Sequence, residues 1–568
     1  MQQTQQAPAK LLYLFLAVWT VINLLQASFV ELHADEAYYW VYSRFLDWGY
    51  FDHPPMVAIF IKIGDALLPN SLGLRLLGVM SSTISVYLLW QMVRKYGDNL
   101  LLFVCMFSSI VLFHVYGFIT TPDSPLFFFS VLFFYFYQRY AAEDKLKWAL
   151  LLALVIAGLL YSKYHGILIL FFTILSNFRL LKRPSFWLVV FLATLLFSPH
   201  IWWQIQHNYP SFYYHVIDRN AAFYQFKFSY EYILAQLALA GPLLGWYYYR
   251  SVFSVVRSDA FISALKFNCY GIFLFFLIST LKGRVEAHWT LPAMLCLFIL
   301  AYIALSSKEI PRWFYKLAVV NLCLILVTRL ILVIPIPALL KLKVVDYYFG
   351  TAEWAQQIQE KAGASPVIFT DSFQVPSRYD YYTRSTRGFG YDSRSYRKNQ
   401  FDIWPLEDSL RNKRVYFVLS EPHPGTGQQD TILTRKGSFY GRWIDQVRTY
   451  QKVVIQPDPL PQQWTRGAHK MLMLNIYNPY EQSINLGNVG QKWHCTLEYA
   501  FRKDGETGPF HAVKADLEQI NIAPGASVRV PAIIELPQVP GAYKLIFSIR
   551  TEPFDGSRNS NMITVDLH

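Results

Sequence analysis

Long apolar runs recur from residue 11 to residue 338, and they constrain the fold of this chain more than any other feature. A helix that crosses the hydrocarbon core of a bilayer needs about 20 consecutive apolar residues. The runs lie at residues 11–30, 72–93, 99–118, 124–139, 148–161, 166–178, 185–199, 230–249, 260–281, 289–306 and 313–338. We therefore expect a polytopic α-helical membrane protein with about 11 transmembrane helices. The first run is longer than the apolar core of a signal peptide, so we expect an uncleaved helix.

Composition agrees with a membrane protein and excludes other classes. Apolar residues make up 54% of the chain and charged residues 16%, whereas an average globular chain has about 25% charged residues. A disordered chain or a disulfide-stabilised miniprotein would not have this composition. Up to Val345 there are 26 Lys and Arg against 15 Asp and Glu, so most of the net charge of +13 lies in the apolar part. Basic residues between apolar runs are topology signals, and we expect no nucleic-acid partner.

The distribution of basic residues predicts the orientation. If the N-terminus lies inside, the inner loops carry most of the basic residues that flank the runs. These are Arg94, Lys95, Arg139, Lys145, Lys147, Arg179, Lys182, Arg183, Arg250, Arg257, Lys308 and Arg312. Because cytoplasmic loops carry an excess of Lys and Arg, we predict a cytoplasmic N-terminus. An odd number of spans then places the residues after about Lys341 on the other side.

The tail has a different character, with 25 basic and 23 acidic residues after Val345. Residues 346–450 combine a helical start with strand-like runs at 366–369 and 415–419, which predicts a small α/β domain. Residues 451–568 alternate short strands with turn signals such as Asn478-Pro479 and Pro524-Gly525, which predicts an antiparallel β-sandwich. We thus expect three domains: a transmembrane domain at 1–345, an α/β domain at 346–450 and a β-sandwich at 451–568.

Acidic residues gather in the predicted outer loops. Asp35 and Glu36 follow the first run, Asp123 lies at the next outer turn, and Glu286 lies at a later one. Holding ionisable groups near hydrocarbon costs free energy, so such residues are functional candidates. The alternative is that they are solvated charges at the ends of helices.

Five short segments strengthen the functional interpretation. They read Asp35-Glu36-Ala37-Tyr38-Tyr39-Trp40, Asp52-His53-Pro54-Pro55, Thr121-Pro122-Asp123-Ser124-Pro125, Ser162-Lys163-Tyr164-His165-Gly166 and Lys282-Gly283-Arg284-Val285-Glu286-Ala287-His288-Trp289. In this order they resemble the bacterial polyprenyl-phosphate-sugar-dependent glycosyltransferases. That superfamily includes the protein O-mannosyltransferases and the lipid A aminoarabinose transferases, and it has the GT-C fold. The resemblance extends over residues 10–340, so we expect a GT-C-like transmembrane domain.

The resemblance implies an inverting sugar transfer from a polyprenyl phosphate such as undecaprenyl phosphate. A hydroxyl acceptor then needs a carboxylate base, and the leaving phosphate needs cations. Asp35 matches the first acidic position of the family and is the candidate general base or acceptor-orienting carboxylate. Its alternative role is the N-cap of a helix from Glu36 to Tyr42.

Glu36 and Asp123 are the other candidate catalytic residues. Glu36 is a candidate ligand of the acceptor or of a metal. Asp123 matches the second acidic position of the family, where it would position the acceptor or stabilise a neighbouring lysine. The alternative for Asp123 is a turn before a helix.

Three cations are candidates for binding the donor phosphate. Lys163, Lys282 and Arg284 all lie at predicted outer ends of helices, where arginine suits bidentate phosphate contact and lysine acts as a point charge. Ordinary snorkelling of these side chains to the interface is the alternative. Arg329, inside the last apolar run, is a further candidate.

Three more residues are candidates for substrate binding. His53 could hydrogen-bond the sugar or join a metal site, and a structural histidine is an equal alternative. Glu286 and His288 lie close enough in sequence to Lys282 and Arg284 to form an ion-pair network or a metal site. A divalent metal is a candidate cofactor, although no ligand spacing requires it, and no other cofactor is expected.

The expected partners are a polyprenyl-phosphate sugar as donor, membrane lipids, and a lipid A, glycolipid, polysaccharide or protein acceptor. We expect the protein in the bacterial inner membrane with a periplasmic C-terminal region. A transporter or flippase for lipid-linked sugars is the alternative function, but transporters usually have matched halves, which this sequence lacks. A noncatalytic assembly factor that binds a partner through the β-sandwich would leave the outer-loop carboxylates unexplained.

Overall fold

The computed structural model describes residues 6–218, 224–256, 258–370, 373–391, 394, 398–422, 429–460 and 463–568. The chain divides into two compact units, Met1–Phe349 and Gly350–His568. The predicted further division of the tail at residue 450 stays a prediction.

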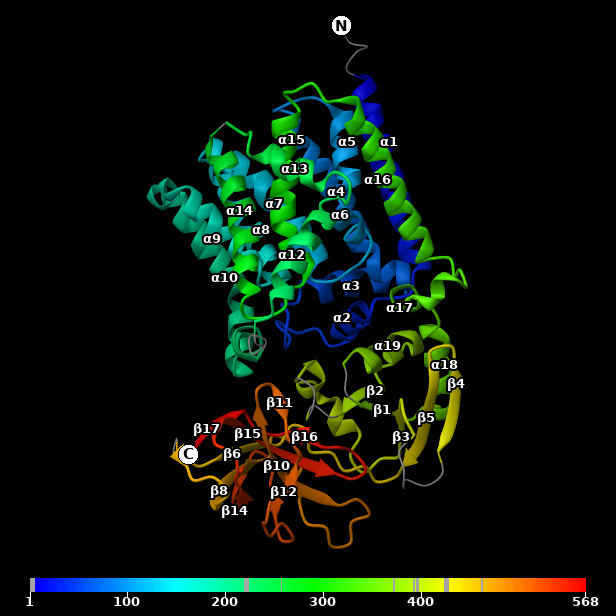
Figure 1. The fold of residues 1–568 in the computed structure, drawn as a ribbon, viewed down its shortest axis with the longest axis vertical. Helices are drawn as coiled ribbons and strands as arrows, with labels where there is room; N and C mark the ends of the chain where they lie inside the picture. Colours follow the sequence, from blue (N-terminus) through cyan, green and yellow to red (C-terminus); the bar gives the residue numbers. More distant parts are fainter. Residues whose placement is uncertain are drawn as a thin grey trace. The chain divides into compact units, whose positions relative to one another are not determined.

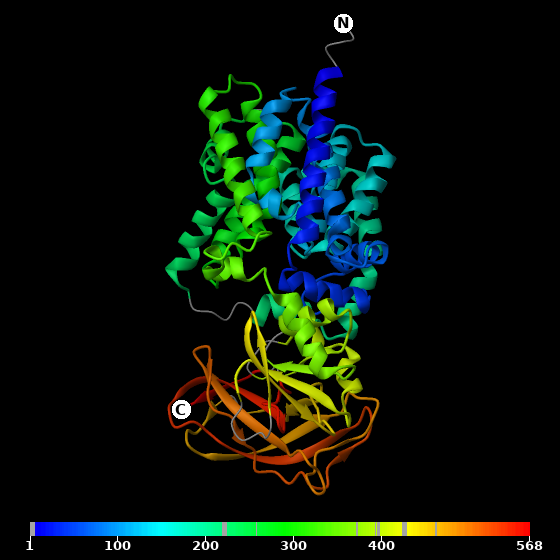
Figure 2. The ribbon, with the colours of Figure 1, turned by 90° about the vertical axis from the view of Figure 1, so that its right-hand side faces the viewer.

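The first unit is helical (Figure 1). Its helices are α1 (Gln6–Phe29), α2 (Ala34–Arg44), α3 (Met56–Leu67), α4 (Ser71–Val93), α5 (Leu100–Ser109), α6 (Val111–Val115), α7 (Asp123–Ala142), α8 (Leu146–Ser162), α9 (Gly166–Ser176), α10 (Pro184–Gln206), α11 (Pro210–Phe212), α12 (Phe226–Leu239), α13 (Gly245–Val252), α14 (Ala260–Ser279), α15 (Leu291–Leu305), α16 (Arg312–Ile331) and α17 (Lys343–Asp346). Short 3-10 or π turns lie at Phe178–Lys182, Tyr213–Asp218, Ala287–Thr290 and Leu339–Lys341. Helices α2 and α3 lie near the end of the bundle that is opposite the first turns of α1 (Figures 1 and 2).

Six segments are long and apolar enough to cross a membrane by length and composition. They are residues 10–29, 71–93, 184–206, 260–279, 287–305 and 312–331 of the described chain. The apolar helices α5, α8 and α9 have 10, 17 and 11 residues, which is shorter than the roughly 20 residues that a perpendicular span needs. A multi-pass membrane region is therefore confirmed, and the count of 11 spans stays a prediction.

Helix α15 lies at the centre of the first unit, because every residue from Leu291 to Leu305 is buried. A helix that is apolar on all sides is stable only when other helices surround it or lipid does, and here α7, α13 and α14 pack against it. The outer helices α1, α10, α14 and α16 instead expose leucine, isoleucine, valine and aromatic side chains. This distribution is typical of a membrane-embedded bundle with lipid-facing outer helices.

The second unit begins with α18 (Thr351–Ala362) and α19 (Gln374–Thr383), which accompany a five-stranded sheet. Its strands are β1 (Val367–Thr370), β2 (Gly388–Tyr391), β3 (Val415–Leu419), β4 (Asp430–Thr434) and β5 (Gly437–Ile444), in the order β2-β1-β3-β5-β4. Strand β1 pairs in parallel with β2 and β3, whereas β5 is antiparallel to β3 and β4.

The remaining strands build the C-terminal β-sheet region. They are β6 (Val454–Pro457), β7 (Gln463–Trp464), β8 (His469–Tyr477), β9 (Ile484–Asn485), β10 (Cys495–Lys503), β11 (Glu506–Thr507), β12 (His511–Ala512), β13 (Asn521–Ile522), β14 (Ser527–Glu535), β15 (Gly541–Thr551), β16 (Ser557–Arg558) and β17 (Ile563–Leu567). One sheet has the order β14-β8-β6 and another contains β11-β10-β15-β17-β7. Alternate residues of both sheets, such as Leu474 and Phe547, share one hydrophobic cluster, as expected for strands with one buried face.

Candidate functional site

Helix α2 carries both acidic residues of the first motif, and its N-cap is His33. The backbone N–H of Asp35 donates to His33 Nδ1 at 3.2 Å, and the backbone N–H of His33 donates to Glu36 Oε2 at 3.1 Å. These two bonds form a reciprocal capping box. The alternative role of Asp35 as the N-cap is therefore wrong, because Asp35 already lies inside the helix. Its side chain is 36% exposed, and its Oδ2 lies 3.6 Å from His33 Nδ1.

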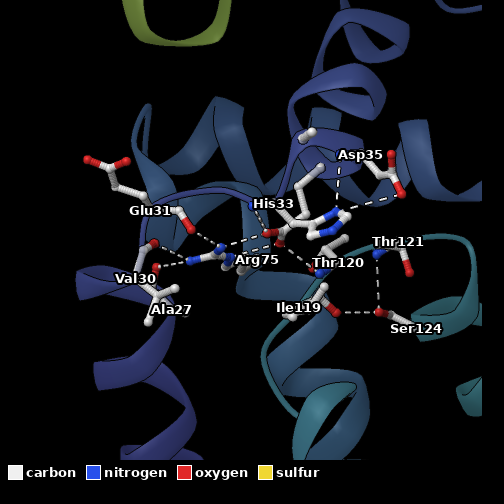
Figure 3. A network of polar contacts seen from close by, with 12 residues as sticks. Ala27, Val30, Glu31, His33, Asp35, Arg75, Ile119, Thr120, Thr121 and Ser124 are labelled. Atoms are coloured by element: carbon white, nitrogen blue, oxygen red, sulfur yellow. Dashed lines mark hydrogen bonds and ion pairs between the residues drawn. The ribbon is translucent and has the colours of Figure 1, made fainter. Parts of the chain in front are cut away.

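The neighbouring carboxylate, Glu36, is fully buried against Arg75 of α4. The guanidinium donates to Oε1 through Nε at 2.8 Å and to Oε2 through Nη2 at 2.6 Å, and both side chains have 0% exposure. Arg75 also donates to three backbone carbonyls at the end of α1, those of Ala27, Val30 and Glu31 (Figure 3). A buried ion pair needs such additional hydrogen bonds to offset its desolvation. The predicted role of Glu36 as a ligand of acceptor or metal stays a prediction.

Glu36 also connects the first loop to the turn that precedes Asp123. The backbone N–H of Thr120 donates to Glu36 Oε1 at 2.9 Å. In the same turn, Ser124 Oγ donates to the Ile119 carbonyl and accepts from the backbone N–H of Thr121 (Figure 3). One buried carboxylate thus fixes both acidic loops, which the sequence separates by more than 80 residues.

Asp123 is the first residue of α7 and forms a buried ion pair with Lys163. The Lys163 ammonium lies 2.8 Å from Oδ1 and 2.7 Å from Oδ2, and the two side chains are 6% and 3% exposed. His288 Nε2 lies 3.7 Å from Asp123 Oδ2, and the His288 side chain is 38% exposed. The structure therefore joins three predicted site residues from three distant segments. Lys163 contacts a carboxylate here, and its phosphate contact stays a prediction.

His53 lies on the loop between α2 and α3, with its ring 5.7 Å from that of Tyr39 and 6.3 Å from that of His215. Its buried Nδ1 has no hydrogen-bond partner among the described residues. Burial lowers the pKa of His53 to about 3, and the nearby Asp52 carboxylate only partly opposes this shift. His53 is therefore a neutral imidazole at physiological pH. The neighbouring Asp52 accepts a hydrogen bond from Tyr42 at 2.5 Å.

The segment 200–215 holds the loop 47–52 in place. Four hydrogen bonds join them: His200 Nδ1 to the Trp48 carbonyl (2.7 Å), Trp203 Nε1 to Asp47 Oδ2 (2.7 Å), Ser211 Oγ to the Tyr50 carbonyl (3.0 Å) and His215 Nε2 to the Asp52 carbonyl (2.9 Å). At Gly49 a Cβ atom would lie 2.5 Å from the Trp203 ring, so only glycine fits this approach. The loop that carries His53 thus has a fixed backbone.

The cations of the last motif lie in a different environment. Lys282 and Arg284 are exposed, and neither forms an ion pair with a described residue. Glu286 is half-buried and precedes the short 3-10 helix at Ala287–Thr290. The predicted ion-pair network of Glu286 and His288 with these cations is not observed in the described part of the chain, because His288 faces Asp123.

Arg329 lies inside the first unit near the end of α16 and is 6% exposed. It donates to Asn23 Oδ1 at 2.8 Å, to His114 Nδ1 at 3.2 Å and to Gln26 Oε1 at 3.5 Å. These contacts tie the last predicted span to the first. The candidate phosphate contact of Arg329 stays a prediction.

Within the described ranges, no group of three or more His, Cys, Asp and Glu side chains has the arrangement of a metal site. The candidate divalent metal therefore stays a prediction.

Sequence reasoning missed two residues that organise the site, Arg75 and His33. The signal for Arg75 was available, because an arginine within an apolar run is a functional candidate by itself and Arg75 lies in the run 72–93. The signal for His33 was weak, since histidine is not among the preferred N-cap residues.

Comparison with known proteins finds a family model that matches part of this chain. Residues 52–203, which include His53, Asp123 and Lys163, match the family model described as dolichyl-phosphate-mannose-protein mannosyltransferase. ArnT from Cupriavidus metallidurans in the apo state has a similar structure, with a TM-score of 0.57 at 15% identity over 77% of this chain and 98% of that chain. The resemblance expected from the sequence is thus confirmed as a similarity to this family over residues 52–203 and to ArnT in fold.

Two further relatives extend the comparison. ArnT from the same organism bound to undecaprenyl phosphate has a TM-score of 0.56 at 14% identity over 76% of this chain and 97% of that chain. The lipid A galacturonosyltransferase RgtD from Rhizobium johnstonii is 21% identical over 318 residues, which are 52% of this chain. This match spans 65% of the length of RgtD.

Proposed function

We propose that this protein transfers a sugar from a polyprenyl-phosphate donor to an acceptor outside the cytoplasm, with inversion at the anomeric carbon. The observation that carries the proposal is the link through Glu36. This buried carboxylate accepts hydrogen bonds from the backbone at His33 and at Thr120. It therefore holds the loops of Asp35 and Asp123 together at one end of the helical bundle.

Asp35 is the proposed general base, because its carboxylate is partly exposed, whereas those of Glu36 and Asp123 are buried. It takes the proton of the acceptor hydroxyl while the acceptor oxygen forms a bond to the anomeric carbon. The bond from that carbon to the phosphate oxygen breaks, and its electron pair leaves with the polyprenyl phosphate. A positioned carboxylate of this kind typically contributes about 10²–10⁴-fold to the rate. Asp123, which is neutralised by Lys163, positions the acceptor.

The leaving phosphate needs positive charge close to its oxygens. Lys282 and Arg284 are the proposed contacts, because both are exposed and without an ion pair to a described residue. Lys163 is a further proposed phosphate contact, and it forms the ion pair with Asp123. The neutral His53 and the half-exposed His288 are proposed hydrogen-bond partners of the sugar, and Glu286 is a further proposed substrate contact. The ArnT structure with undecaprenyl phosphate supports a polyprenyl-phosphate donor for this fold.

The proposed topology has 11 crossings, with the N-terminus in the cytoplasm and residues 346–568 in the periplasm. It is supported by the basic residues of the predicted inner loops. The proposed acceptor is an envelope glycolipid of the lipid A type. The activity in the name of the relative RgtD supports this choice.

Turnover in lipid nanodiscs tests the proposal. The purified protein is incubated with lipid A and a panel of undecaprenyl-phosphate sugars, and released undecaprenyl phosphate is measured together with the glycolipid mass. Asp35→Asn should lower turnover by about 10²–10⁴-fold and leave donor binding unchanged, because asparagine keeps the shape and removes the base. Asp98→Asn is the matched control, since Asp98 is an exposed carboxylate on a predicted inner loop.

Two results would contradict the proposal. Near-wild-type turnover of Asp35→Asn at every pH would remove Asp35 from the mechanism. Movement of intact lipid-linked sugar across the bilayer without release of undecaprenyl phosphate would favour a flippase.

A further inference from the structure

We propose that His33 is a positioning residue for Asp35, and that it performs this role only as a neutral imidazole. This inference rests on the proposed function for the importance of Asp35. The hydrogen bonds that carry it are independent of the sugar and of the acceptor.

The first turn of α2 receives its hydrogen-bond acceptors from His33 and Tyr347. The first N–H groups of a helix have no partner within the helix. Here the Ala34 N–H donates to Tyr347 Oη at 2.9 Å, and the Asp35 N–H donates to His33 Nδ1 at 3.2 Å. The His33 ring packs against the Tyr347 ring at a centroid distance of 5.4 Å. The backbone position of Asp35 therefore depends on the His33 ring.

Histidine is an unusual choice for this position. The preferred N-cap residues Ser, Thr, Asp and Asn accept through an oxygen at every physiological pH. An imidazole Nδ1 accepts only when the ring is neutral and its proton lies on Nε2. Because the Asp35 N–H occupies Nδ1, the structure assigns this tautomer to His33. Protonation of the ring removes the acceptor and breaks the cap.

The charged groups around His33 determine what protonation does next. Asp35 Oδ2 lies 3.6 Å from Nδ1, whereas the Glu36 carboxylate is bound by Arg75. The Glu31 carboxylate points away from the His33 ring (Figure 3), and Tyr347 contributes a neutral ring. A proton on Nδ1 therefore faces Asp35, and the ion pair that forms directs the Asp35 carboxylate toward His33 instead of the acceptor. The His33 side chain is 35% exposed, so solvent protons reach it.

Three variants separate this role from a purely structural one. His33→Asn keeps an N-cap oxygen but does not titrate, and His33→Ala removes the cap. His469→Asn is the matched control, because His469 is an exposed histidine in strand β8 of the second unit. Amide hydrogen exchange of residues 34–36 is measured from pH 5 to pH 8. Turnover with undecaprenyl-phosphate sugars is measured over the same range.

In the wild type, the protection of these amides from exchange should fall at the acidic end of the range, after the general pH dependence of exchange is subtracted. Turnover should fall over the same pH range. His33→Asn should retain both at acidic pH. His33→Ala should exchange about fivefold faster at every pH, the change expected when one N-cap is lost, and its kcat should fall more than its KM rises. The control should follow the wild type.

The exchange experiment needs no substrate, so its result stands even if no donor is turned over and the proposed function fails. Amide protection in the wild type that stays constant across the pH range would overturn the inference. The inference would also be overturned if the protein turned over a donor and His33→Asn lost activity at acidic pH to the same extent as the wild type.

Discussion

Replacement of Arg75 by methionine should strongly destabilise the helical unit. Methionine fills part of the space of the arginine stem but leaves the Glu36 carboxylate, which is fully buried, without a cation. Among the described residues, the carboxylate then retains the N–H groups of Thr120 and His33 as its donors. Breaking a buried ion pair by removing one partner costs about 3–5 kcal/mol. The three carbonyls that Arg75 binds at the end of α1 also lose a donor, but such losses within one network do not simply add.

Denaturation in mixed detergent micelles, followed by tryptophan fluorescence, measures the free energy of unfolding. Lys145→Met is the matched control, because Lys145 and its partner Glu143 are 61% and 53% exposed and such pairs contribute about 0–1 kcal/mol. The double variant Glu36→Gln with Arg75→Met should recover part of the loss, since no buried charge remains. The reasoning would be refuted if the free energies of unfolding of Arg75→Met and Lys145→Met differed by less than about 1 kcal/mol. In that case the buried pair does not hold the loops together.

Three further predictions concern topology, phosphate binding and pH. Reporter fusions at Asp98 and at His568 should report opposite sides of the membrane, and reports from the same side would invalidate the span count. Replacing Lys282 or Arg284 by alanine should weaken donor binding by about 1.5–3 kcal/mol, measured as KM for the donor, whereas unchanged donor kinetics in both variants would favour the snorkelling alternative. Because the folded pKa of His53 is about 3 and an ordinary histidine titrates near 6.5, the unfolded chain binds a proton first as the pH falls. The stability that depends on neutral His53 should therefore be present above about pH 6.5 and be lost toward pH 3. His53→Gln should flatten this slope in pH-dependent unfolding, and an unchanged slope would contradict the assignment.

The membrane class and the family resemblance could be derived from local sequence. Apolar runs report membrane helices because the bilayer imposes a length and a hydropathy on each helix separately. The acidic pair after the first run and the turn at Asp123 could be found in the same way, since each motif is contiguous. The strands of the tail could be expected because their alternation has a period of two residues.

Only the tertiary structure decided which charges meet. Asp35 and Glu36 are neighbours in sequence, yet one is partly exposed and the other is fully buried against Arg75. Lys163 is a candidate phosphate contact by its position at a helix end, and the fold shows that it binds Asp123. A charge pair forms between atoms a few ångströms apart, and its desolvation depends on everything packed around it. Neither the distance between two charges nor their desolvation is encoded in local periodicity. Both are set when segments from distant parts of the chain come together.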